Sequence, residues 1–275
     1  MLQLLEIGVK FTLYLTTLTA IGLSIHAAIG LPRHRRLLLP LALSIPVLKA
    51  MHLLLLNAQL SGNLTGIVDF SMFGWIWPLH QAQVITLTTA SLLIVVGSLL
   101  DRVIIGLIGA LGIAISFGLG GHAQGLEGVS IAPTLVAIHT AVAGFWFAAP
   151  ITLFPRRMQS RETLSANLDA FSIIAIWLVP LIFMTGAVTV WLLIGSIEQI
   201  LHESYGQLLL GKLFLATIAL AIGAINRNHI SDLIRLQPLK GKRLLALSLK
   251  AEAVLFAALL AFLVCATTLV GPDTG

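Results

Sequence analysis

The hydrophobic pattern of this chain consists of long apolar runs separated by short polar stretches. Eight runs are about 20 residues long, the length that an α-helix needs to cross a hydrocarbon core of about 30 Å. The pattern therefore predicts an all-α fold, a polytopic membrane bundle of eight transmembrane helices that forms a single transmembrane domain over residues 1–275. Only Asp101 and Arg102 separate the third run from the fourth. The expected helices are about 5–29, 37–58, 82–100, 103–119, 131–154, 168–195, 206–226 and 247–270.

Composition agrees with a protein that crosses a membrane several times. Hydrophobic residues make up 58% of the chain and charged residues 10%, and the mean hydropathy is +1.01. These values exclude an ordinary soluble domain and indicate a lipid bilayer as the surroundings. The formal net charge of +5 would suggest nucleic acid as the partner of a soluble protein, but here the basic residues sort by side of the membrane, so we expect no nucleic-acid partner.

The distribution of basic residues predicts an orientation. Lys and Arg are absent from three of the stretches between the apolar runs, 59–81, 120–130 and 196–205. The positive-inside rule places those stretches and both chain termini outside the cytoplasm, and the alternation requires an even number of spans. The basic residues of the other stretches and their margins are Arg33, Arg35, Arg36, Arg102, Arg156, Arg157, Arg161, Arg227, Arg235, Lys240, Lys242, Arg243 and Lys250.

Two features of the chain ends limit the chemistry. No basic segment precedes the first apolar run, so we expect it to remain as a helix and not to be cleaved as a signal peptide. The single cysteine, Cys265, lies in the last run, which disfavours a thiolate copper site. The sequence also contains no nucleotide-binding loop, no Cys-x-x-Cys pair and no hydrolase triad, so a conventional enzyme is disfavoured.

Histidines inside apolar runs are the main candidates for chemistry. His122 lies in a glycine-rich loop, and His139 lies about six residues, roughly 9 Å, inside the helix that follows. His52 is at nearly the same depth in the expected second helix, and Lys49 shares its face. Ionisable side chains at such depths usually face a bundle interior or a watery cavity, where Lys49 would repel cations.

Three further residues are candidate ligands. His80 opens the expected third helix at the outer face, and Met51 and Met184 offer thioether sulfur, a soft donor that suits Cu(I). Each candidate also has a structural interpretation. Met184 fits ordinary core packing, and Lys49 fits a pair that locks packing while His52 bonds to neighbouring backbone.

Three stretches together resemble the bacterial copper-resistance protein D family (CopD), which are integral proteins of the inner membrane. The resemblance covers about residues 115–272. In the N-terminal part of the chain, only Phe73-Gly74-x-x-Trp77 resembles the family. At the position of His80 the family tends to place an arginine. The stretches are Gly121-His122-Ala123 with His139 and the Gly144–Pro155 run, Tyr205–Leu213 ending in Asn226-Arg227, and Glu252 at the start of a last helix that ends near Gly271-Pro272.

The resemblance implies copper handling in the bacterial inner membrane. Such a protein would receive copper from a periplasmic CopC-type carrier and move it toward the cytoplasm, in copper homeostasis or resistance. His122 and His139 match histidines of the family's central motif. Lys212 and Arg227 match family positions to which we assign no role.

Our leading hypothesis is a copper-permeating protein. His122 would form an outer site, and His52 and His139 would converge on a deeper one with Met51, Met184 or His122 as third donor to Cu(I) or Cu(II). Histidine also binds zinc, nickel and haem iron. A b-type haem protein that passes electrons is therefore an alternative, since axial ligation needs two histidines at equal depth. A non-transporting assembly factor for a copper enzyme is a third hypothesis.

Overall fold

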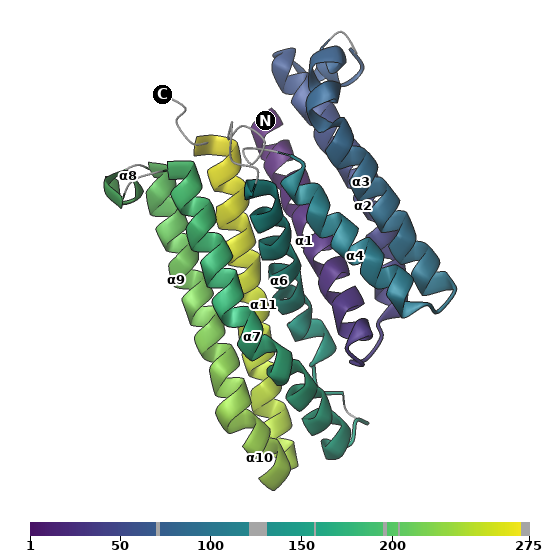
Figure 1. Cartoon of the computed structure of the whole chain (residues 1–275), viewed down its shortest axis with the longest axis vertical. Helices are drawn as coiled ribbons and strands as arrows, with labels where there is room; N and C mark the ends of the chain where they lie inside the picture. Colours follow the sequence, from purple (N-terminus) through teal and green to yellow (C-terminus); the bar gives the residue numbers. More distant parts are fainter. Residues whose placement is uncertain (70–71, 121–130, 157, 195–196, 203, 271–275) are drawn as a thin grey trace.

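The computed structural model describes the chain except residues 70–71, 121–130, 157, 195–196, 203 and 271–275. The described residues form helices and short connections, with no strand among them. Figure 1 shows most of the long helices running side by side along the long axis of the molecule. The expected all-α membrane bundle is thereby confirmed.

The described residues of the first part of the bundle form five α-helices and one short helix. Tight turns join α1 to α2 and α3 to α4, so consecutive helices run in opposite directions (Figure 1). The turn between α3 and α4 passes through Asp101, whose φ of 54° is a left-handed conformation that Asp tolerates better than most residues. The helices are α1 (Leu2–Ala28), α2 (Arg35–Leu60), η1 (Leu64–Ile67), α3 (Phe73–Leu99), α4 (Val103–Gly118) and α6 (Ala132–Thr152).

The second part contains three long helices and several short ones. The helix α9 continues through η2, a π-helix, into α10, and the last long helix α11 returns beside it and ends in a second π-helix, η3. The elements are α7 (Arg161–Ile194), α8 (Ile197–His202), α9 (Ser204–Ile225), η2 (Asn226–Ile230), α10 (Ser231–Leu236), α11 (Pro238–Cys265) and η3 (Ala266–Val270).

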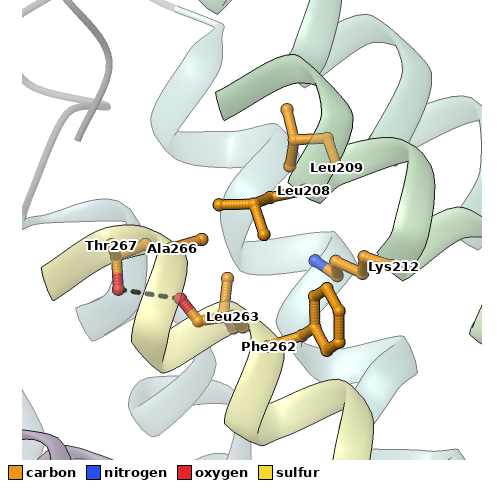
Figure 2. A pocket seen from close by; sticks show the side chains of 7 residues that line it. All are labelled: Leu208, Leu209, Lys212, Phe262, Leu263, Ala266 and Thr267. Atoms are coloured by element: carbon orange, nitrogen blue, oxygen red, sulfur yellow. Dashed lines mark hydrogen bonds between the residues drawn. The ribbon is translucent and has the colours of Figure 1, made fainter. Parts of the chain in front are cut away.

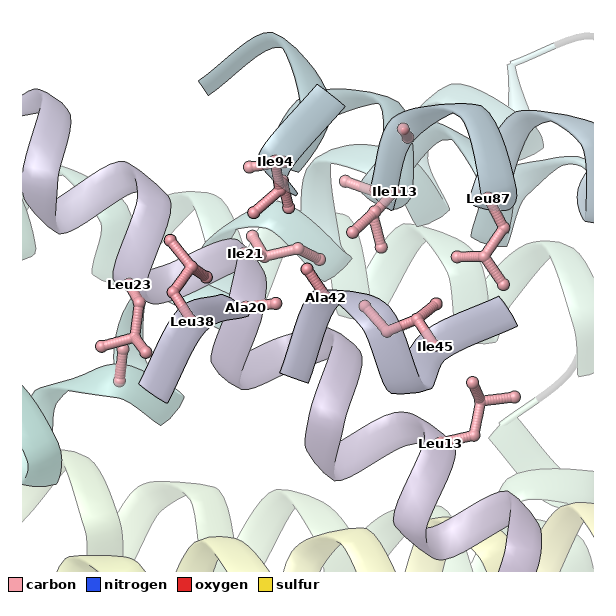
Figure 3. Close-up of a cluster of buried hydrophobic side chains, with 14 residues drawn as sticks. Leu13, Ala20, Ile21, Leu23, Leu38, Ala42, Ile45, Leu87, Ile94 and Ile113 are labelled. Carbon is pink, nitrogen blue, oxygen red and sulfur yellow. The ribbon is translucent and has the colours of Figure 1, made fainter. Parts of the chain in front are cut away.

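Small residues allow α1 to pack closely against its neighbours. A Cβ atom at Gly22 would lie 2.0 Å from the carbonyl oxygen of Gly144 and 2.6 Å from the Cβ of Ala148, so α1 and α6 meet backbone to backbone there. On its other side α1 joins α2, α3 and α4 around one hydrophobic cluster, which includes Ile21 and Ile45 (Figure 3). Helix α1 is therefore the central element of the first half.

Two further clusters build the second half. The larger one surrounds the stacked rings of Phe145 and Phe171, whose centroids are 4.6 Å apart, and joins α6, α7, α10 and α11. The smaller one contains Ala219 and Phe256 and joins α9 to α11. Trp146 packs against both, so α6 connects the two halves of the protein.

Seven of the described helices are long and apolar enough to cross a membrane, so the chain is a multi-pass membrane protein. Helix α4 is shorter and spans about 24 Å at 1.5 Å per residue. The Lys10 ammonium donates to the Thr267 carbonyl oxygen at 3.4 Å, which places the start of α1 beside η3 at the end of the last helix. The beginning of α1 and the end of the last long helix thus lie at the same end of the helical bundle.

Helix boundaries differ from expectation in three places. We expected the third helix from residue 82 and a loop before it, but α3 begins at Phe73, whose ring stacks on Trp77 one turn later at 5.9 Å. Helix α7 begins at Arg161 instead of residue 168, and α11 at Pro238 instead of residue 247. In each case the helix extends beyond its apolar run into polar or aromatic residues. Backbone hydrogen bonds can continue a helix there, because they do not require apolar side chains.

Candidate functional site

A group of polar side chains lies where the beginning of α1 meets the second half of α2 and the first half of α3. We call it the α1–α3 polar cluster, and it consists of Glu6, Lys49, His52, His80 and Gln83. Glu6 of α1 is only 5% exposed, and its Oε1 lies 3.7 Å from His52 Nε2 on α2. Its Oε2 accepts a hydrogen bond from Gln59 Nε2 at 2.5 Å.

The imidazole of His52 is buried without hydrogen bonds. Neither ring nitrogen has a hydrogen-bond partner within the described part of the chain, although the residue is only 8% exposed. Buried polar atoms are nearly always satisfied by protein, water or an ion, so an unsatisfied imidazole beside a carboxylate requires an explanation. These two groups are a nitrogen donor and an oxygen donor on facing helices.

Lys49 and His80 complete the cluster. Lys49 is 4% exposed and its ammonium donates to Gln83 Oε1 at 2.7 Å. His80 lies beside Gln83 and within electrostatic range of His52 and Lys49, and its buried Nδ1 has no partner in the described structure. The cluster therefore combines two imidazoles that have ring nitrogens without partners, a carboxylate and the Lys49 cation, and Lys10 of α1 is a second cation in electrostatic range; both oppose the binding of a further positive charge.

His139 lies in a separate place, between α6 and α7. Its Nδ1 is 3.1 Å from the Thr185 hydroxyl, which itself donates to the Leu181 carbonyl at 2.8 Å. Since that hydroxyl has one proton, it accepts from His139, and this assigns the imidazole proton to Nδ1. The arrangement leaves the Nε2 lone pair for another ligand, as in metal sites where a neighbouring group fixes the tautomer.

Lys212 lies close to this second histidine. It points into a small hollow between α9 and the end of α11, beside Leu208 and Phe262 (Figure 2). Its charge acts on His139. Both candidate histidines thus have a lysine in electrostatic range, Lys49 for His52 and Lys212 for His139.

The structure does not bring His52 and His139 together. Helix α1 packs against α2 and against α6, whereas the extensive contacts of α2 in the described structure are with α1, α3 and η1. The nearest polar groups of the two histidines also differ, Glu6 for one and Thr185 for the other. The expected equal depth of two residues along their helices does not determine the directions in which their side chains point.

The two methionines lie away from these groups. Met184 is 64% exposed although the next residue, Thr185, is buried, and Met51 is 45% exposed beside buried His52. Residues adjacent in a helix point about 100° apart, so each methionine points toward the bundle surface. His122 lies outside the described residues. Among the residues described, no three His, Cys, Asp or Glu side chains converge as a metal site.

Sequence reasoning missed two buried carboxylates. Glu6 lies within the expected first helix, 5–29, but was not among the candidate residues, and it is buried in the bundle near the start of α1. Glu252 was placed near the start of the last helix, whereas it lies near the middle of α11 and is 3% exposed. A carboxylate inside an apolar run was the available signal in both cases, because such residues are costly to bury.

Comparison with known proteins gives one family. Residues 165–266, which cover nearly all of α7 and continue through α11, match the sequence model of the family described as copper resistance protein D. This match covers fewer residues than the resemblance described above, which extends over about residues 115–272. It does not include the stretch with His122 and His139. No curated protein and no solved structure matches the chain. The match over residues 165–266 thus makes this part of the membrane protein similar to the copper resistance protein D (CopD) family and supports the resemblance found in the sequence.

Proposed function

We propose that this protein carries copper ions across the bacterial inner membrane, from the periplasm toward the cytoplasm. The family match supports a role in copper resistance. The observation that carries the transport proposal is the buried His52 imidazole, which has no hydrogen-bond partner in the described structure and lies 3.7 Å from the buried Glu6 carboxylate. Imidazole suits copper in both oxidation states, and the carboxylate lowers the cost of bringing a cation there.

The site in this proposal differs from a shared His52–His139 centre. His52 and Glu6 form the outer copper-binding pair, His80 lies within electrostatic range of His52 as a separate donor, and His122 delivers the ion from its loop. His139, oriented by Thr185, offers Nε2 as a second station between α6 and α7. Copper passes from donor to donor in this scheme, and Met51 and Met184 are left out because their side chains are exposed.

The lysines have a part in this scheme. Lys49 lies within the α1–α3 polar cluster, and Lys212 acts on His139. A permeation site must bind weakly enough to release its ion, and a nearby ammonium group weakens cation binding. We infer that each lysine limits the residence of copper at its histidine. A CopC-type carrier on the outer side would supply the ion, and the protein would act without catalysing a reaction.

The orientation follows from charge. The arginine-rich ends of α2, α7 and α10 are proposed to face the cytoplasm, and the α1–α3 polar cluster the periplasm. The proximity of Lys10 to Thr267 supports termini on one side. With α4 as a short eighth span, this arrangement gives eight crossings and an external position for both termini.

Metal analysis of the purified protein beside its visible spectrum tests the proposed function. We expect copper to bind wild-type protein and His202→Ala, a matched control with an exposed histidine, and to bind His52→Ala and Glu6→Gln at least tenfold more weakly, a loss of about 1.4 kcal/mol in binding free energy. Equal copper affinity in all four proteins would contradict the proposed site. A Soret band with no bound copper would instead support the haem alternative.

A further inference from the structure

Glu252 is a buried carboxylate that the proposed copper path does not use. It lies near the middle of α11, between Leu249 and Phe256, which belong to the two hydrophobic clusters of the second half. The residue is only 3% exposed. Placing an ionised carboxylate among apolar side chains is expensive unless a cation or several hydrogen bonds compensate.

No cation compensates Glu252 in the described structure. The elements packed against α11 carry ionisable side chains, but the polar group that acts on Glu252 is Asn226 of the π-helix η2. Lys250, two residues away on α11, is exposed. The other charged or histidine side chains on the elements packed against α11 form no ion pair with Glu252 in the described structure, and they are Glu6, Lys10, His26, His139, Lys212, Arg227, His229, Asp232 and Arg235.

The Asn226 side chain donates one hydrogen bond to Glu252, and its acceptor oxygen has no partner in the described structure. Its Nδ2 donates to Glu252 Oε1 at 2.6 Å, and the residue is 7% exposed. Its Oδ1 is buried and has no partner in the described structure. A carboxylate has no proton to offer this oxygen, whereas a carboxylic acid has one. A proton on Glu252 Oε2 would therefore satisfy Asn226 Oδ1 and complete an acid–amide pair with two hydrogen bonds.

A polar groove begins on the other side of the same π-helix. The groove has a volume of about 450 Å³ and lies at the arginine-rich end of the bundle. Ser231 lines it and is itself only 6% exposed, and its hydroxyl donates to the Asn226 carbonyl oxygen at 3.2 Å. Single π-turns inside α-helices occur frequently at functional sites. The polar residues of the groove are Asp169, Ser172, Arg227, Asn228, Ser231, Asp232 and Arg235.

We propose that Glu252 and Asn226 form a proton-binding site in the interior of the helix bundle, which exchanges protons with the groove past Ser231. A proton from water in the groove bonds to Glu252 Oε2 and converts the carboxylate to a carboxylic acid, and it leaves by the same route. No electrons are transferred. This inference goes beyond copper transport and stands if the protein carries a different cargo.

Infrared difference spectroscopy of the purified full-length protein tests the site directly. We expect a carbonyl band of a protonated carboxyl group at neutral pH that shifts in D₂O and is absent in Glu252→Gln. The matched control is Glu6→Gln, which removes another buried carboxylate but one that contacts His52 and Gln59. That control should keep the band. Absence of the band from wild-type protein, or its persistence in Glu252→Gln, would overturn the proposal.

Two more variants keep the test decisive if Glu252→Gln does not fold. Asn226→Ala removes the partner and leaves the carboxyl group, so the band should move to higher wavenumber, as for a carbonyl with a hydrogen bond removed. An unmoved band would show that Asn226 is not the partner. Ser231→Leu adds an apolar side chain at the groove wall and should slow the shift in D₂O severalfold, and an unchanged rate would contradict the route through the groove.

Discussion

The two halves of the bundle are held together in different ways. The most apolar stretch of α1 is 44% buried within the protein, whereas that of α9 is only 6% buried and that of α7 11%. Helix α1 reaches this burial because Gly22 admits the backbone of α6. Helices α7 and α9 instead expose large side chains such as Trp177 and Phe214 to the surroundings. In a lipid bilayer this exposure has little free-energy cost, since apolar side chains contact lipid tails as favourably as they contact other apolar side chains.

The comparison shows where specificity comes from in a membrane protein. In the first half, close backbone contact fixes the helices, and the polar cluster lies at one end of that rigid frame. In the second half, polar pairs between helices supply directional contacts, such as Asn226 with Glu252 and His139 with Thr185. We therefore expect added bulk to damage the first half most and removal of polar groups to damage the second half most.

The largest expected effect is from Gly22→Ala. The added Cβ would meet the Gly144 carbonyl oxygen at 2.0 Å, so α1 and α6 must move apart, and we expect a loss of about 2 kcal/mol in unfolding free energy. Gly8→Ala is the matched control on the same helix, because a Cβ there has nothing within 4 Å. It should be neutral or slightly stabilising, since alanine favours helix more than glycine. Equal effects in denaturant titrations in micelles would refute close packing at Gly22.

A smaller effect is expected from Thr185→Val. This change keeps the shape of the side chain but removes the oxygen that accepts from His139, and it should lower unfolding free energy by about 1 kcal/mol. Thr189→Val, one turn further along α7, is the control because the Thr189 hydroxyl bonds only to its own helix at the Thr185 carbonyl oxygen. A loss of stability at Thr189 as large as that at Thr185 would remove the support for the interhelical bond.

The smallest expected effect depends on pH and involves His34, which lies in the turn before α2. Burial first, and the neighbouring Arg156 guanidinium second, lower the pKa of His34 below its usual value. The unfolded chain then binds the proton more readily than the folded protein, so stability falls as pH decreases through the ordinary histidine value of about 6.5. His34→Gln should reduce the stability difference between pH 7 and pH 5, and an unchanged difference would exclude His34 as its source.

The sequence was sufficient to predict the fold class but not the side-chain partners. Apolar runs of spanning length predict helices because each span must satisfy its own backbone hydrogen bonds in lipid. Residues such as Phe73 and Pro238 begin helices outside the apolar runs, so their positions depended on tertiary structure. The buried positions of Glu6 and Glu252 depended on which face of a helix points inward, and weak apolar asymmetry around membrane helices leaves that face undetermined by sequence.

The candidate site was predicted in part. His52 was predicted as a histidine of the second helix that faces the interior, and it is buried on α2, but its neighbour Glu6 was not predicted. The structure gives His52 and His139 different polar neighbours, Glu6 for one and Thr185 for the other, and α1 packs against both of their helices. Met51 and Met184 are exposed, and sequence distance from a histidine does not show which way a thioether points. The contacts between helices decide all three outcomes.

Copper flux into proteoliposomes tests the central claim most directly. The wild-type protein and the exposed-histidine control His202→Ala should both take up copper faster than empty vesicles. His52→Ala should reduce uptake at least tenfold, since it removes the buried imidazole that faces Glu6. Circular dichroism and elution volume should show that the variant is folded. Copper uptake by folded His52→Ala at the wild-type rate would contradict the account.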